Sequence, residues 1–201
     1  MDINNAADKL NSNGFKAQVF ETSEQAKAAV MELIPPGADV GIGGSMTVFE
    51  MGLHTTLMEG GRNVFWHWLA KPEDRAETLA KAHNADYYLM SSNAVTMEGE
   101  LINIDGNANR LGSMLYGPKE VIVICGRNKL VLDPMKAIER IKTVACPQNA
   151  RRLKLSTPCA TLNRCTECRS DQRMCSAVVR LQRPCGGRTF HVFLVNEDLG
   201  Y

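Results

Sequence analysis

The feature that most constrains the fold is an unbroken apolar run at residues 121–124, which reads Val-Ile-Val-Ile. Because the run does not alternate between apolar and polar residues, both faces of the strand that it predicts must be buried. Strands of this kind lie in parallel sheets that helices cover on both sides. The run, taken with its neighbours as residues 120–125, therefore predicts an α/β domain with a mostly parallel sheet.

The rest of the chain alternates between strand and helix patterns, as such a sheet requires. Short apolar runs predict further strands at residues 38–42, 63–68, 86–90 and 190–195. A capping box, Thr22-x-x-Gln25, predicts the start of a helix that ends near Leu33. Further helices are expected over residues 46–60, over residues 72–83 and after residues 133–134. The fold class we predict is α/β, with a Rossmann-like, mostly parallel sheet.

Length and charge exclude several classes of protein. A chain of 201 residues can bury the core of one α/β domain. The formal net charge of +1 argues against a general nucleic-acid binder. We see no apolar run long enough for a membrane span and no secretory signal, so we expect a cytoplasmic protein without a framework of disulfides.

Cysteines and charge gather near the C-terminal end of the chain. Residues 151–188 hold nine basic and two acidic side chains, a net charge of +7, whereas the remainder carries −6. Four of the seven cysteines lie within 17 residues, at Cys159, Cys165, Cys168 and Cys175. We therefore divide the chain into an α/β core (1–155), a cysteine-rich, metal-binding insertion (156–188) and a final strand that returns to the core (189–201).

The spacing of these four cysteines suggests a metal site. Four thiolates suit a 4Fe–4S cluster or a tetrahedral zinc ion, and one CxxC with single flanking cysteines fits the larger cluster better. Nearby arginines would offset the negative charge of either centre. Zinc, a regulatory Cys165–Cys168 disulfide and four plain thiols stay open as alternatives. Cys185 is a reserve ligand, and Cys125 is expected in the core.

Two polar stretches predict a ligand site at the carboxyl ends of the strands. The first is the glycine-rich turn at residues 41–47, where backbone N–H groups and hydroxyls can meet an anion. The second is the Asn-, Asp- and Gly-rich stretch at residues 93–110, together with Asn128 and Lys129. Both also suit ordinary turns. Glu50 and Asp105 are the candidate catalytic carboxylates.

Three stretches together resemble the lactate-utilisation (LUD) domain family. They read GIGGSMTVFEMGL, NAVTMEGELINIDGNANR and GPKEVIVICGRNKLV, the last followed by DPMKAIERIKTVACPQNARRL. The resemblance runs from about residue 20 to the C-terminal end. It implies a fold similar to ribose-5-phosphate isomerase, glucosamine-6-phosphate deaminase and CoA transferases. The matching ligand-site positions are Gly43, Gly44, Ser45, Thr47, Asn93, Thr96, Asp105, Gly106, Asn109 and Arg110.

The resemblance also implies a role in lactate and pyruvate metabolism beside iron–sulfur partner proteins. Our first hypothesis is an oxidoreductase subunit that binds a small anionic metabolite and an iron–sulfur cluster. The second is a non-redox regulatory module with structural zinc. The third is an isomerase- or transferase-like enzyme on a phosphorylated or CoA-linked substrate. The sequence leaves open whether the chain is itself an enzyme and whether it forms a homo-oligomer.

Overall fold

A six-stranded parallel sheet forms the centre of the molecule in the computed structural model, which describes residues 1–201. The strand order is β1-β10-β7-β4-β2-β3, and every neighbouring pair is parallel. The strands are β1 (Lys16–Phe20), β2 (Asp39–Ile42), β3 (Asn63–Trp66), β4 (Tyr87–Met90), β7 (Glu120–Gly126) and β10 (Thr189–Val195). The predicted α/β fold with a Rossmann-like, mostly parallel sheet is therefore confirmed.

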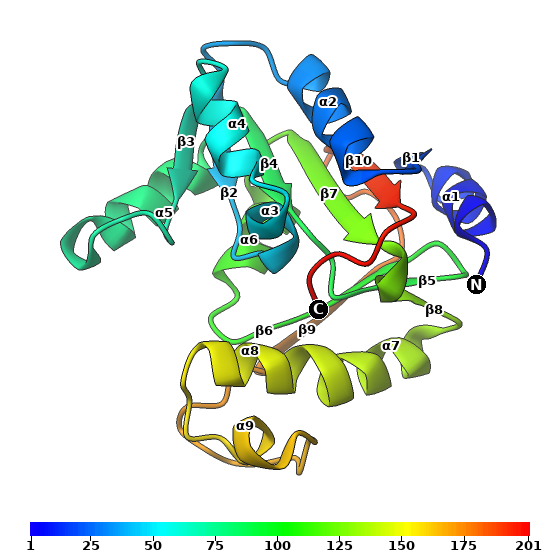
Figure 1. Ribbon diagram of the computed structural model, residues 1–201, viewed down its shortest axis with the longest axis vertical. Helices are drawn as coiled ribbons and strands as arrows, with labels where there is room; N and C mark the ends of the chain where they lie inside the picture. The colour runs from blue at the N-terminus through cyan, green and yellow to red at the C-terminus, as the bar shows by residue number, and fades with distance from the viewer.

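Helices cover both faces of this sheet (Figure 1). Alternate side chains of β7 enter opposite cores: Val121 and Val123 belong to one, Ile122 and Ile124 to the other. This two-sided burial is why the run is apolar throughout. The first face is covered by α1 (Ile3–Ser12), α5 (Arg75–His83) and α6 (Asn109–Tyr116). The second is covered by α2 (Ser23–Leu33), α3 (Met46–Glu50) and α4 (Leu53–Glu59).

A second, smaller sheet carries the remaining strands. Its order is β8-β5-β6-β9, with bounds β5 (Ala94–Thr96), β6 (Leu101–Asp105), β8 (Leu130–Val131) and β9 (Ala177–Leu181). One face packs against α7 (Pro134–Arg140) and a π-helical turn (Ile141–Ala145) that leads into α8 (Cys146–Arg152). Pro147 has no N–H for the α-helical ladder, which accounts for the widened turn before it. The short α9 (Pro158–Leu162) lies beyond α8 in Figure 1.

Three sequence expectations need correction or refinement. The helix expected over residues 46–60 is two helices, because Gly52 adopts φ +64° between α3 and α4. The Asn-, Asp- and Gly-rich stretch at residues 93–110, for which no strand is expected from the sequence, contains β5 and β6. The segment 156–188 includes β9, which pairs with β6 and ties it to the second sheet. The 3₁₀ turns at Pro72–Asp74 and Arg127–Lys129 complete the elements.

The capping box is present as predicted: the Thr22 hydroxyl accepts from the Gln25 backbone N–H, and the Gln25 side chain reaches back. No helix combines the length and apolar character that crossing a bilayer requires.

Candidate ligand pocket and cysteine segment

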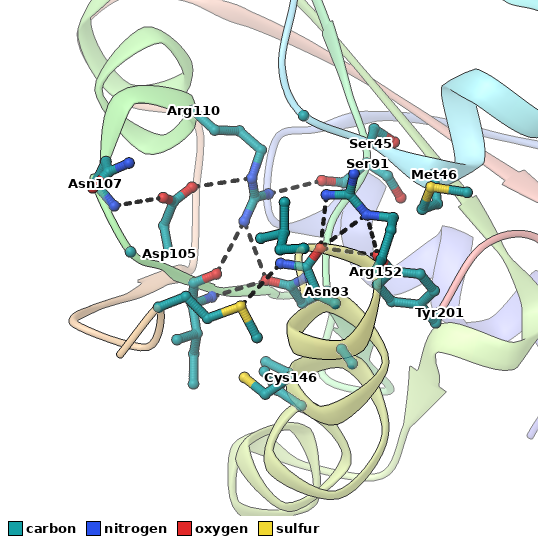
Figure 2. Close-up of a pocket in the computed structure, with 18 of the residues that line it drawn as sticks. Ser45, Met46, Ser91, Asn93, Asp105, Asn107, Arg110, Cys146, Arg152 and Tyr201 are labelled. Carbon is teal, nitrogen blue, oxygen red and sulfur yellow. Dashed lines mark hydrogen bonds and ion pairs between the residues drawn. The ribbon is translucent and has the colours of Figure 1, made fainter. Parts of the chain in front are cut away.

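A pocket of about 210 Å³ lies where the carboxyl ends of the central strands face α8. The residues after β2, β3 and β4 supply one side, β6 and α6 a second, and α8 with Tyr201 a third. Figure 2 shows Ser45 and Ser91 from the first side, Asp105 and Arg110 from the second, and Arg152 and Tyr201 from the third. This is the edge at which open α/β sheets bind ligands. The volume suits a small metabolite, since sites for drug-sized ligands start at about 300 Å³. Eight predicted site residues line it: Gly44, Ser45, Asn93, Asp105, Gly106, Asn109, Arg110 and Lys129.

The glycine-rich turn supports the pocket mainly through close packing. Ser45 lines the pocket, and its hydroxyl caps α3 by accepting from the Val48 N–H at 3.2 Å. Gly43 lies behind the wall, where an added Cβ would come within 2.9 Å of the Arg110 and Tyr88 side chains. The turn therefore needs a glycine there to let Arg110 pass beneath it.

Arg110 uses all its hydrogen-bonding capacity on the protein. The guanidinium has five N–H donors. Nε donates to Asp105 at 3.2 Å; the two terminal nitrogens donate to four acceptors, the carbonyls of Ser91 and Ile104 and the side-chain oxygens of Asn93 and Asn103. Arg110 thus links the segment after β4, at Ser91 and Asn93, to β6. It adds positive charge to the pocket but has no donor left for a ligand.

Lys129 is a buried amine at the floor of the pocket, 3% exposed. Its Nζ donates to the hydroxyls of Thr47 and Ser91, each at 2.8 Å. It forms no ion pair with any carboxylate. Burial, with a smaller contribution from the charges of Arg140 and Arg110, lowers the pKa of Lys129 to about 8.

Aromatic and polar side chains form the opposite wall. The Arg152 guanidinium stacks over the Trp68 ring at 4.4 Å and donates to the Tyr201 hydroxyl at 3.0 Å. His67 also lines the pocket, and its buried Nδ1 has no hydrogen-bond partner. Burial, then the charge of Arg75, lowers the pKa of His67 and favours the neutral imidazole. These groups leave donors and acceptors that a ligand can use.

The charge of the pocket lining is strongly positive. Asp105 is the one carboxylate side chain of the lining, against four cationic side chains: Arg75, Arg110, Lys129 and Arg152. Asp105 is already paired with Arg110, so no lining side chain offsets the charges of the other three. A cavity with this balance attracts anions.

Other predicted residues lie outside the lining. Glu50 is exposed, and its carboxylate accepts from the Gly200 N–H at 2.7 Å. Asn128 holds the same C-terminal tail by accepting from Leu199 and donating to Gly200. Thr96 forms the turn before β6, where its hydroxyl accepts from the Glu100 N–H. Thr47 reaches the pocket only through Lys129.

The four clustered cysteines lie on the segment between α8 and β9, which we call the cysteine segment (residues 159–175). All seven thiols of the chain are free. No three Cys, His, Asp or Glu side chains are arranged as a metal-holding group. The predicted ligand set therefore stays a prediction. Cys185 packs instead against the sheet core beside α6, where its thiol donates to the Leu115 carbonyl at 3.7 Å.

Cys146 stands next to this segment, although the sequence pattern gave no reason to group it there. It begins α8, lines the pocket and packs with Cys175 against the core of the second sheet. Burial, followed by the charges of Cys175, Cys159 and Cys165, raises its pKa to about 12. The chain thus brings a fifth thiol between the pocket and the cysteine segment.

The cysteine segment also forms part of the pocket wall. Met174 lines the pocket, and its sulfur accepts from the Asn149 side chain at 3.1 Å. The neighbouring Ser176 N–H donates to the Asp105 carbonyl at 3.0 Å. An added Cβ on Gly106 would meet the Met174 backbone at 3.0 Å, so the two segments approach closely. Pocket and cysteines therefore share one boundary.

Sequence reasoning missed much of the far wall of the pocket. The missed residues come from α8, α5, the cysteine segment and the C-terminal tail: Arg75, Cys146, Asn149, Arg152, Met174 and Tyr201. A signal was present for α8, since its PQNARRL end lies within one of the stretches that resemble the family. Arg75 and Tyr201 carry no local pattern that marks them.

Comparison with known proteins agrees with this architecture. A sequence model of the LUD domain matches residues 3–195, nearly the whole chain. No curated protein matches. A crystal structure of a DUF162 family protein from Deinococcus radiodurans superposes with a TM-score of 0.56 at 14% identity, over 96% of each chain, which supports the fold alone. On the strength of the family match, this chain belongs to the LUD domain family.

Proposed function

We propose that this LUD domain protein serves lactate and pyruvate metabolism by binding a small anionic metabolite in the pocket. We further propose that the adjoining cysteines hold a 4Fe–4S cluster, as in a redox subunit. The observation that carries the proposal is the shared boundary: Met174 of the cysteine segment and Cys146 both line the cationic pocket. A redox centre held there would lie beside the bound metabolite.

The charge of the lining favours a carboxylate ligand. Arg152 is held in place by the Trp68 ring and Tyr201, and it retains N–H donors that make no bond to the protein. A guanidinium held in this way can bind a carboxylate with two parallel hydrogen bonds. Lys129, at the floor, supplies a second positive group near Ser91. The small volume fits a three-carbon acid better than a nucleotide.

The chemistry of the donor set is compatible with an iron–sulfur cluster. Cys159, Cys165, Cys168 and Cys175 would hold the cluster, and each is only partly buried. Arg173 donates to the Cys175 thiol at 3.2 Å and to the Cys168 carbonyl at 3.0 Å. Such a cation offsets the negative charge of a thiolate-ligated centre. When bound, the cluster would supply one-electron transfer, while Arg152 and Lys129 orient the metabolite.

Isothermal titration calorimetry with lactate and pyruvate tests the metabolite site. Arg152→Gln removes a pocket cation and should weaken binding about ten-fold or more, because charge-assisted hydrogen bonds contribute about 1.5–3 kcal/mol. Arg151→Gln is the matched control. Arg151 precedes Arg152 in the sequence, but it lies outside the pocket lining and donates to Asn163 on the cysteine segment. We expect the control to bind as the wild type does.

Two results would contradict the metabolite site. The first is the absence of binding by the wild-type protein. The second is an equal loss of affinity in the Arg151 and Arg152 variants, because it would indicate a general charge effect and not a contact in the pocket.

A further inference from the structure

Lys129 is the one buried cation of the pocket that has no acidic partner. Buried lysines are usually paired with a carboxylate, since burial penalises the charged form. The amine of Lys129 instead contacts two hydroxyls, those of Thr47 and Ser91. Arg110, by contrast, is paired with Asp105. Because no carboxylate fixes the proton on Lys129, its amine can also exist in the neutral form.

We propose that Lys129 is a nucleophilic residue that forms an imine with the carbonyl carbon of a small 2-oxo acid bound in the pocket. This inference rests on the proposed function, because it requires an anionic metabolite there. The carboxylate of the acid would lie toward Arg152, and its carbonyl would face the Lys129 amine. The substrate class is therefore a 2-oxo acid. The bond that forms joins Nζ of Lys129 to the ketone carbon, C2, of that acid.

The chemistry of the step balances without any further reactant. The neutral amine attacks the carbonyl carbon, and a proton moves from nitrogen to oxygen to give a carbinolamine. Loss of water from the carbinolamine then leaves the imine, so that amine and ketone yield imine and one water molecule. No electron donor or acceptor is needed, and hydrolysis reverses the step.

The surroundings of Lys129 suit both protonation states of its amine. The Thr47 and Ser91 hydroxyls accept from Nζ, while their own protons are donated to the carbonyls of Leu199 and Ser92. A neutral amine still has two N–H donors for these two oxygens, which leaves its lone pair free to attack, whereas a carboxylate partner would favour the charged form. The lowered pKa, about 8, supports this view, because it makes the neutral amine accessible near neutral pH.

Reductive trapping tests the inference. The full chain is incubated with pyruvate and sodium cyanoborohydride, and its adducts are measured by intact mass and located by peptide mass spectrometry. We expect one main adduct, with the mass of pyruvic acid less one oxygen, on Lys129. The exposed Lys136 is the internal control for non-specific modification. Excess lactate, which has a hydroxyl in place of the ketone, should protect Lys129 but not Lys136.

The variant Lys129→Arg keeps the positive charge without a nucleophilic amine, so it should lose the main adduct. If this variant fails to fold, the site mapping on the wild-type protein still decides the question. Calorimetry with lactate separates the two proposals. Lactate binding without enrichment of the adduct at Lys129 over Lys136 overturns the inference and leaves the metabolite site intact. Absence of both binding and adduct overturns both.

Discussion

Replacing Arg110 by methionine tests whether this residue organises the pocket wall. The Arg110 and Asp105 side chains are only 9% and 13% exposed, and their ion pair measures 3.2 Å. Removing one partner of a buried pair costs about 3–5 kcal/mol, because the other charge is left without compensation. Arg110→Met also leaves the side chain of Asn103, which is fully buried, without its 2.7 Å donor.

We therefore expect Arg110→Met to lower the free energy of unfolding by about 3–5 kcal/mol, a large share of the 5–15 kcal/mol typical of a domain. Urea denaturation followed by circular dichroism measures the change. The exposed pair Arg127–Asp198 provides the control, with side chains 57% and 70% exposed. Arg127→Met should cost no more than about 1 kcal/mol.

A double-mutant cycle with Asp105→Asn isolates the pair. If Arg110 acts through Asp105, the two substitutions together should cost clearly less than the sum of the single costs. A cost below about 1 kcal/mol for Arg110→Met alone would refute the reasoning, since it would mean that the five hydrogen bonds are not formed in the folded protein.

Two further predictions concern packing and pH. Gly41→Ala should destabilise the protein by about 1–3 kcal/mol in urea denaturation, because the new Cβ would lie 2.8 Å from the Ala82 carbonyl carbon. A Cβ added at Gly112 in α6 would have no atom within 4 Å, so Gly112→Ala should be neutral or stabilising. Equal losses of stability in the two variants would contradict the close approach of Gly41 to Ala82. For Lys129, the folded pKa of about 8 lies below its ordinary 10.5, so the unfolded state holds more protons between these values. The free energy of unfolding of the wild type minus that of Lys129→Met should therefore rise between pH 8 and pH 10.5, by roughly 3 kcal/mol at most. If this difference stays constant over the same pH range, the pKa of Lys129 is not lowered by folding.

The central sheet could be predicted because its signals are local. Both faces of β7 are buried, so its apolar residues follow one another without interruption, and the capping box at Thr22 is complete within four residues. The near wall of the pocket could be predicted for a related reason. Polar residues such as Asn93 and Lys129 follow strand ends directly, and the ends of parallel strands meet at one edge.

The far wall could not be predicted, because it depends on contacts between distant segments. Arg152 meets Trp68 and Tyr201 only after α8 has packed beneath the sheet. β6 was hidden for a different reason: its buried Asn103 looks like a loop residue until Arg110 is seen to satisfy it. The break between α3 and α4 likewise could not be predicted, because it depends on the positive φ that Gly52 adopts in the folded chain.

The cysteine ligands can be tested by substitution. Cys165→Ser and Cys168→Ser should each reduce the iron content, because each removes one thiolate of the proposed ligand set. Cys185→Ser is the control, because that thiol lies against the sheet core. Iron and acid-labile sulfide analysis measures the effect, and an unchanged content in the first two variants would show that the ligand set is wrong.

The most direct test of the proposed redox role is the visible spectrum of the protein purified without oxygen. If the cysteine segment holds a 4Fe–4S cluster, we expect a broad absorption at about 400 nm that dithionite bleaches. A colourless protein that contains one zinc ion per chain would contradict the proposal and make the cysteine segment a structural zinc site.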